Sequence, residues 1–465
     1  MSAIPAAMAE PHTGLAASKS TALMRLRRYW PRIAIAIIIT AGAIFRLTVY
    51  GDPRLSVPTR DTASYVKASR VPLLSRNMWT GRRLFTTNLI YKVFPPPKGL
   101  EIAPTEATGF REIQPGFDQI ALLQVCMSIV GWSLLAVAFA WHQKNPLIKI
   151  LSTVLILAFG YVPQIADWDS VLGSEALTYS LFMAAFGLIL LLVFRLDRSS
   201  RVDAWTVLLI VAYFICLFFW NFLRDANLPA IWITAGMTLA TLAIPRFRGL
   251  RAIQIAALAL IALAVGGTLT AARSNRSQIQ LEHIFTVVIA PSPARAAFAE
   301  KLGMPAPGSP EYLPWIKQDA PSVYLRFLAA FPGFTASTYV QGAYMAAANY
   351  IQPYFRTPRS DWRNRLLPVG EVLHGGFVFI VLDVMLLVIL GSLAVRNPAN
   401  DIRAWTWLAV WLILCAAGTL FVSVFGDIVA INRHSLLSIA LFRLFFWLFF
   451  LVIVDQLFFT REART

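Results

Sequence analysis

Residues 172–194 read LGSEALTYSLFMAAFGLILLLVF and carry a single charged side chain, Glu175, near their beginning. An apolar run of about twenty residues is long enough to cross the hydrocarbon core of a bilayer as an α-helix. Basic residues such as Arg195 follow the run and end it. This stretch therefore predicts a transmembrane helix, and similar runs along the chain predict an all-α membrane fold.

The composition agrees with this interpretation. Of the 465 residues, 57% are hydrophobic and only 14% are charged, whereas a soluble surface needs roughly a quarter of its residues charged. A soluble enzyme is excluded. The three cysteines all lie inside apolar runs, so neither a disulfide framework nor a thiolate metal site is indicated. The sequence predicts ten spans, near 31–50, 118–141, 147–163, 172–194, 204–222, 227–244, 252–271, 373–395, 404–425 and 434–454.

Two long segments interrupt the series of spans, at 51–117 and 272–372. They divide the chain into five parts. These are an N-terminal tail (1–30), spans one to seven with the first long segment (31–271), the second long segment (272–372), spans eight to ten (373–454) and a C-terminal tail (455–465). The first span is too long for the apolar region of a signal peptide and lacks a small-residue cleavage pattern, so we expect it to remain as an anchor.

The basic residues of the short connectors predict the orientation. With the N-terminus in the cytoplasm, seventeen Lys and Arg residues fall inside and only Arg224 and Arg433 fall in the short outside turns. Basic residues concentrate on the cytoplasmic side of membrane proteins. We therefore expect both termini to be cytoplasmic and both long segments to be extracytoplasmic, most simply at a bacterial inner membrane.

The two long segments are basic and contain amphipathic stretches. The first has ten Lys and Arg against five acids, and the second has ten against six. Apolar side chains recur at helical spacing around 321–331, which predicts a helix lying on the membrane surface or packed against another loop. Long translocated segments are exempt from the positive-inside rule, so the excess charge indicates an anionic partner such as a lipid phosphate. General attraction to anionic headgroups is the alternative; membrane lipids are expected partners and nucleic acid is not.

Two arginines lie within or at the edge of the predicted spans. An unpaired charge there costs about 2.5–3.5 kcal/mol. The long stem of Arg46 can reach the headgroups, because Arg46 lies near the outer end of the first span. Arg443 lies nine residues beyond His434, about 13 Å along a helix. We expect Arg443 to face the bundle interior, as a cation in a wet cavity or in a structural ion pair.

Polar side chains collect at the outer ends of the spans. Asp167 and Asp169 precede the fourth span, Glu175 opens it, and Arg433 and His434 open the last. Helix capping accounts for single acids at these positions, and Arg224 next to Asp225 suggests a local salt bridge. Convergence on one face, at the level of Asp61 in the first long segment, favours a shared site.

Several short patches carry a resemblance to a known family. They are Asp61-Thr-Ala-Ser-Tyr65-Val-Lys-Ala68, Gly81-Arg82-Arg83-Leu84-Phe85 with Asn88-Leu-Ile-Tyr91, Leu123-Gln124-Val-Cys-Met-Ser128, Ser174-Glu175-Ala176-Leu177 and Asn432-Arg433-His434. Together with the layout of spans and loops, they resemble integral-membrane glycosyltransferases of the GT-C fold class, particularly bacterial relatives of protein mannosyltransferases and aminoarabinose transferases. In that family the catalytic acid lies in the first outer loop, and it is often followed by a second acid where this chain has Thr62.

The resemblance implies transfer of a sugar from a polyprenyl-phosphate donor to a hydroxyl group of a glycan, lipid or protein. Such a reaction needs a carboxylate to accept the hydroxyl proton and cations to stabilise the departing phosphate. Asp61 is the predicted general base. The predicted phosphate ligands are Arg82, Arg83, Arg433 and His434, and the predicted supporting acids for the acceptor are Asp167, Asp169 and Glu175. No cofactor is indicated, and a requirement for a divalent metal stays open.

Two other functions compete with this interpretation. A polymerase or ligase of O-antigen type is also a multi-pass enzyme with a large basic outer loop, but it needs no acid after the first span. A transporter or lipid flippase would have inverted repeats and broken helices at the midplane, and only Arg443 favours it. The glycosyltransferase hypothesis predicts that Asp61, Asp167 and Asp169 share one cavity with Arg433 and His434.

Overall fold

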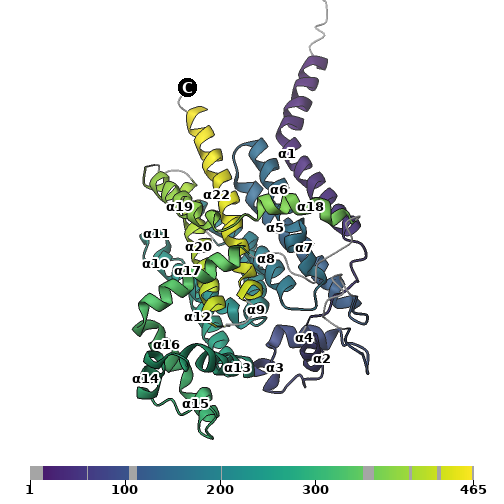
Figure 1. Cartoon of the computed structure of the whole chain (residues 1–465). Helices are drawn as coiled ribbons and strands as arrows, with labels where there is room; N and C mark the ends of the chain where they lie inside the picture. The colour runs from purple at the N-terminus through teal and green to yellow at the C-terminus, as the bar shows by residue number, and fades with distance from the viewer. Residues whose placement is uncertain are drawn as a thin grey trace, which may run out of the picture.

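The structure is a computed structural model that describes residues 14–59, 61–103, 113–199, 202–348, 361–396, 401–426 and 431–462. Within these ranges most of the chain is helical, and the only β-type pairing is an isolated bridge between Val57 and Val171. Figure 1 shows the helices arranged as a bundle, with shorter helices gathered at one end. The fold is therefore all-α in its described part, as the sequence predicts.

Eight helices are long and apolar enough to cross a membrane, which makes the chain a multi-pass membrane protein by length and composition. They are the hydrophobic part of α1 (Tyr29–Val49), α5 (Asp118–His142), α8 (Glu175–Arg198), α9 (Ala204–Asn221), α12 (Arg251–Ala272), α19 (Val378–Arg396), α20 (Ile402–Phe425) and α22, of which Leu436–Leu457 is apolar. Each coincides with a predicted span.

The two remaining predicted spans are less regular. The span predicted at 147–163 is α6 (Pro146–Tyr161), which is followed after a 50° bend by a short helical segment over Pro163–Ser170. That segment consists of α7 (Pro163–Ala166) and the 3-10 turn η1 (Asp167–Ser170). The span predicted at 227–244 is α10 (Leu228–Leu242), which has 15 residues. Ten helices thus stand where ten spans are expected, and the number that crosses the bilayer stays a prediction.

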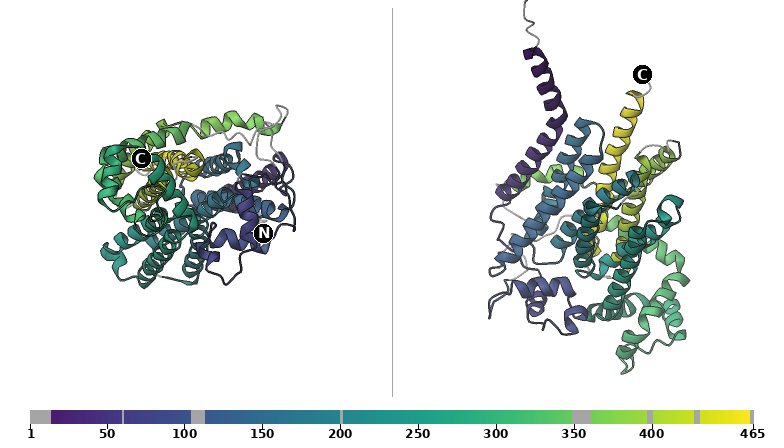
Figure 2. Two further views of the ribbon diagram at one scale, coloured as in Figure 1. Left: turned by 60° about the horizontal axis from the view of Figure 1, so that its bottom comes forward. Right: turned by 180° about the vertical axis from the view of Figure 1, so that it is seen from behind.

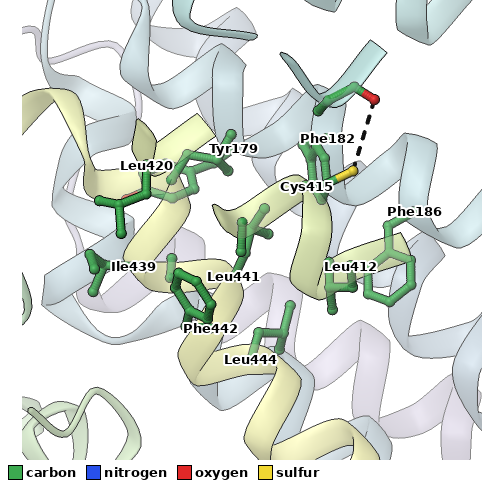
Figure 3. Close-up of a cluster of buried hydrophobic side chains, with 14 of the residues drawn as sticks. Tyr179, Phe182, Phe186, Leu412, Cys415, Leu420, Ile439, Leu441, Phe442 and Leu444 are labelled. Carbon is green, nitrogen blue, oxygen red and sulfur yellow. Dashed lines mark hydrogen bonds between the residues drawn. The ribbon is translucent and has the colours of Figure 1, made fainter. Parts of the chain in front are cut away.

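Helix α8 is the centre of the bundle and the most deeply buried of the long helices. It packs against α5, α9, α20 and α22. Figure 3 shows part of this core, where Phe182 and Phe186 of α8 lie beside Leu412 and Cys415 of α20. The residues that decided the fold class in the sequence therefore become its structural axis.

Glycines allow α5 and α8 to approach closely. A Cβ atom on Gly131 of α5 would lie 2.4 Å from the carbonyl oxygen of Ser180 in α8. A Cβ atom on Gly187 of α8 would lie 3.1 Å from the backbone of Leu134. Small residues at helix interfaces are the usual means of close packing in membranes, where no hydrophobic force drives helices together.

The two long segments contribute the shorter helices. The first holds α2 (Thr62–Ser69), α3 (Asn77–Thr80) and α4 (Phe85–Val93). The second holds α13 (Asn275–Ile284), the π-helical turn η3 (Phe285–Ile289), α14 (Pro293–Lys301), α15 (Tyr312–Gln318), α16 (Ala320–Ala330), α17 (Pro332–Ala348) and α18 (Trp362–Leu373). The predicted helix around 321–331 is confirmed as α16; its placement on a membrane surface stays a prediction. Short turns complete the chain: η2 (Asp225–Asn227), α11 (Pro245–Arg248) and α21 (Ile431–His434).

The two ends of the bundle differ. Helices α2 to α4 and α13 to α16 gather at one end, which we call the loop end. Helix α1 begins and α22 ends at the opposite end, which we call the terminal end, in both Figure 1 and the rear view of Figure 2. The first described residue of α1, Gly14, and the last of α22, Glu462, therefore lie on the same side, and which side faces the cytoplasm stays a prediction.

Candidate functional site

Asp61 immediately precedes α2 at the loop end. It occupies the N-cap position, but its side chain makes no capping hydrogen bond to the helix. Its two carboxylate oxygens instead pair with two arginines: Oδ1 lies 3.0 Å from Arg83 and Oδ2 lies 3.1 Å from Arg433. Helix capping therefore does not explain this acid, and Asp61 joins the first long segment to α21, the short helix that precedes the last span.

Local packing fixes the Arg83 side chain. Its guanidinium donates hydrogen bonds to the hydroxyl of Ser64, at 2.8 and 2.6 Å, and lies 4.1 Å from the centre of the Tyr65 ring. Both partners belong to α2, whereas Arg83 lies between α3 and α4. Stacking on an aromatic face and fork-shaped hydrogen bonding are the interactions that distinguish arginine from lysine. Arg83 is thus held in one orientation toward Asp61.

Glu175 extends the arrangement into the bundle. It opens α8 and is buried, and its Oε1 atom accepts a hydrogen bond of 2.7 Å from Nε of Arg433. Arg224 lies 3.6 Å from the same oxygen and also contacts Nδ1 of His434 at 2.8 Å. The Glu175 carboxylate can occupy this position because residue 173 is a glycine: a Cβ atom on Gly173 would lie 2.3 Å from that carboxylate.

We call Asp61, Arg83, Glu175, Arg224, Arg433 and His434 the Asp61 cluster. Its three arginines and two carboxylates give a formal charge of +1 when His434 is neutral.

Exposure differs along this cluster. The side chain of Asp61 is 31% exposed, that of Arg433 is 15% exposed and that of Glu175 only 3%. Burial disfavours the charged form of Asp61, but Arg83 and Arg433 outweigh this effect and hold its pKa below the ordinary value. Burial lowers the pKa of Arg224, which Glu175 partly offsets. Asp61 is therefore an ionised carboxylate that solvent can reach.

A small recess of about 10 Å³, room for about one water molecule, lies beside the cluster and is strongly basic. Its lining includes Arg82, Arg83, Arg224 and Arg276, with the hydroxyl-bearing side chains of Ser174 and Ser274, as well as Asp225. Arg82 is exposed, whereas its neighbour Arg83 is buried. The two adjacent arginines therefore differ in their contacts: Arg83 is paired with Asp61, and Arg82 is exposed at the surface.

Asp167 and Asp169 belong to a different set of contacts. Asp169 pairs with Arg46 at 2.9 Å, and Asp167 lies 3.4 Å from Arg363 of α18. Arg46 also donates a hydrogen bond of 2.9 Å to the carbonyl of Ala166. We call Arg46, Asp167, Asp169 and Arg363 the Asp169 cluster. The expected single cavity is therefore replaced by two groups of ion pairs: Asp61, Arg83, Glu175, Arg433 and His434 come together, and Asp167 and Asp169 pair elsewhere.

Arg443 faces the interior of the bundle, as expected from its depth in the last span. It is 1% exposed and donates hydrogen bonds to the carbonyls of Gly375, at 2.7 Å, and Ala347, at 2.8 Å. These carbonyls lie at the end of α17 and just beyond α18. Carbonyls at helix ends lack intrahelical partners, so Arg443 serves to join these two helix ends to α22.

Several residues of these clusters were not identified from the sequence. Arg224 pairs with Glu175 and His434 rather than with Asp225, whose carboxylate accepts from the backbone of Ala226. Arg276 and Arg363 lie in the second long segment and gave no separate signal beyond its basic composition. Arg46 was noted for its position, and its partner Asp169 explains its burial.

Within the described ranges, no three His, Cys, Asp or Glu side chains come together in a way that would hold a metal ion. Comparison of the chain with known proteins found no matching family model, no matching curated protein and no matching solved structure.

Proposed function

We propose that this protein is a membrane glycosyltransferase that moves a sugar from a polyprenyl-phosphate donor to a hydroxyl acceptor, with Asp61 as the general base. One observation carries the proposal. Asp61 is a partly exposed carboxylate at the loop end, held between Arg83 and Arg433 and beside a recess lined by further arginines. An accessible base next to concentrated positive charge is what transfer from a phosphate leaving group requires.

In the proposed reaction, the acceptor oxygen attacks the anomeric carbon of the sugar as the bond from that carbon to the phosphate oxygen breaks. The hydroxyl proton passes to Asp61, and the bonding electrons leave with the polyprenyl phosphate. Negative charge develops on that phosphate, where arginine donors stabilise it. The exposed Arg82 and the partly exposed Arg433 are the proposed first contacts, with Arg83 and His434 behind them.

The arginines also control the basicity of Asp61. In the free protein they hold its pKa low, which keeps the carboxylate ionised but makes it a weak proton acceptor. A bound phosphate competes for the same guanidinium groups, and Asp61 then regains proton affinity. The base is thus strengthened only when the donor is in place.

Glu175 has a positioning role in this proposal. It is buried and bonded to Arg433, so it orients that arginine and does not touch the acceptor. The pairing of Asp167 and Asp169 with Arg363 and Arg46 favours a structural role for both acids. The carbonyl partners of Arg443 account for its burial without a transport path. The proposed setting is the extracytoplasmic face of a bacterial inner membrane, with both termini in the cytoplasm.

The test is transfer in detergent or lipid nanodiscs from purified polyprenyl-phosphate sugars to glycan and lipid hydroxyls, followed by mass spectrometry of the products. Wild type should form product, and Asp61→Asn should form it at least about a hundredfold more slowly. Asp52→Asn is the matched control, because Asp52 is an exposed acid of the same segment. Transfer that survives Asp61→Asn at the wild-type rate would refute the role of Asp61 and favour a polymerase or ligase of O-antigen type.

A further inference from the structure

A second cavity lies at the terminal end of the bundle, away from the Asp61 cluster. It has a volume of about 330 Å³, within the range of small-molecule sites. Five helices, α8, α9, α10, α12 and α20, together with the turn α11, contribute to its wall. We call it the α10–α12 groove.

The wall of the groove is apolar. It includes Leu192 of α8, Phe214 of α9, Ala256 and Leu260 of α12, and Trp407 of α20. Three threonines of α10 also face it, but their hydroxyls are occupied within the protein. Thr234, Thr238 and Thr241 each donate to a carbonyl four residues back in the same helix. The indole of Trp407 donates to Thr241 at 3.1 Å. Satisfied hydroxyls leave a hydrocarbon-like surface.

The charges of the groove are confined to one end. Its charged lining residues are Asp197 at the end of α8, Arg246 in α11 and Arg403 at the beginning of α20. Arg246 pairs with Asp197 at 3.3 Å. Arg403 is exposed and makes no ion pair within the described part of the chain. Because Asp197 offsets Arg246, Arg403 leaves the mouth with a formal charge of +1.

The groove matches the dimensions of one membrane leaflet. On α12 it extends from Ala252 near the mouth to Leu260, a rise of about 12 Å at 1.5 Å per residue. Half of a bilayer's hydrocarbon core is about 15 Å thick. An acyl chain that enters at the arginines would therefore end close to the middle of the membrane.

We infer that the α10–α12 groove binds one acyl chain of an anionic glycerophospholipid, with the phosphate of its headgroup at Arg403. The charge of the mouth matches that of the lipid, and the apolar depth matches its chain. A polyprenyl-phosphate donor fits less well. Its phosphate would lie near Arg224 beyond the far end of α9, whereas the mouth lies at the opposite ends of α9 and α10.

The experiment uses the full chain, purified in detergent, stripped of lipid and supplied with phosphatidylglycerol or phosphatidylcholine of identical acyl chains. Native mass spectrometry measures the bound lipid. A single arginine near an anionic headgroup contributes about a fivefold preference. Wild type should therefore bind phosphatidylglycerol at least about fivefold more tightly than phosphatidylcholine. The variant Arg403→Gln should lose this preference, and Arg396→Gln, an exposed arginine at the end of α19, should keep it.

Filling the groove tests the position of the acyl chain. Ala256→Phe should abolish binding of both lipids, whereas Ile255→Phe, on the exposed face of the same helix, should leave binding unchanged. If Ala256→Phe fails to fold, Ala252→Phe at the mouth serves instead. Equal affinity for the two lipids, or binding that survives both filling variants, would overturn the inference. Displacement of phosphatidylglycerol by equimolar polyprenyl phosphate would overturn it in favour of the donor's tail.

Discussion

The Asp61 cluster and the Asp169 cluster are built from the same chemistry but differ in what they leave accessible. Each pairs two carboxylates with arginines drawn from distant parts of the chain. In the pair of Asp169 with Arg46, the two side chains are 3% and 4% exposed. In the Asp61 cluster the acid itself is 31% exposed. A fully buried ion pair can contribute only to the packing of helices, whereas the partly exposed carboxylate of Asp61 can also contact another molecule.

The stoichiometry of the two clusters differs as well. Arg46 and Arg363 each face an acid of the η1 turn, and Asp361 adds a further carboxylate to Arg363. The Asp61 cluster has an excess of arginine, and more arginines line the adjoining recess. An excess of positive charge over negative charge in and beside the cluster favours an anionic ligand. Matched substitutions in the two clusters can test whether the exposed acid acts in the reaction and the buried ion pairs stabilise the fold.

The largest expected effect is on the reaction. Asp61→Asn should lower kcat/KM for sugar transfer by roughly 10²- to 10⁴-fold, the usual contribution of a general base, or about 2.7–5.4 kcal/mol of transition-state stabilisation. Asp167→Asn, in the closed cluster, should change the rate per folded molecule by less than about tenfold. Initial rates normalised to the folded fraction provide the measurement. Equal losses in the two variants would erase the functional distinction between the clusters.

The next effect is on stability. Arg46→Ala leaves Asp169 buried without its partner, and breaking a buried pair costs about 3–5 kcal/mol. The matched control is Arg198→Ala, because Arg198 pairs with Asp401 at the same 2.9 Å distance but with a side chain that is 51% exposed. An exposed pair contributes about 0–1 kcal/mol. Thermal unfolding in detergent should show a clearly lower midpoint for Arg46→Ala than for Arg198→Ala, and similar midpoints would contradict the assigned structural role.

The fold could be predicted from the sequence because membrane helices leave a local signal. Runs of apolar residues located all eight described helices that are long and apolar enough to cross a membrane, and also α6 and the 15-residue α10. The bend after α6 was missed. Pro163 is the last residue of the predicted span, and the short helical segments α7 and η1 that follow it are not marked by an apolar run of their own. The positions of the membrane helices could therefore be predicted wherever a long apolar run forms one uninterrupted helix.

The clusters could be predicted only in part. Asp61 and Arg433 were grouped because both lie at the same level of the bundle, although 372 residues separate them. Two residues at the same height along a bundle can still lie on different sides of it. The sequence therefore predicts Asp169 beside Asp61, whereas the structure pairs Asp169 with Arg46. The partner of Asp167 is Arg363, which depends on how the second long segment folds back on α7. No local pattern encodes that path.

A smaller effect concerns pH. Arg83 lowers the pKa of Asp61, so Arg83→Gln should raise it toward or above the ordinary value of about 3.9. The base must be deprotonated to act, and the acid limb of the kcat/KM profile should therefore move to higher pH in Arg83→Gln. Arg363→Gln should leave that limb in place. A limb that stays fixed in Arg83→Gln would show that another group titrates in it.

The smallest effect is expected at Arg82, where the open cluster meets solvent. Arg82 is exposed and makes no ion pair within the described residues, so no protein contact is lost in Arg82→Gln and the unfolding midpoint should stay unchanged. An exposed charge contributes up to about 1 kcal/mol, which predicts a rise in the KM for the donor of up to about fivefold with kcat nearly constant. Arg76→Gln, an exposed arginine of the same segment, should leave KM unchanged. A fall in kcat in Arg82→Gln would contradict a role in donor binding alone, because it would mean that this side chain stabilises the departing phosphate more strongly in the transition state than in the bound donor.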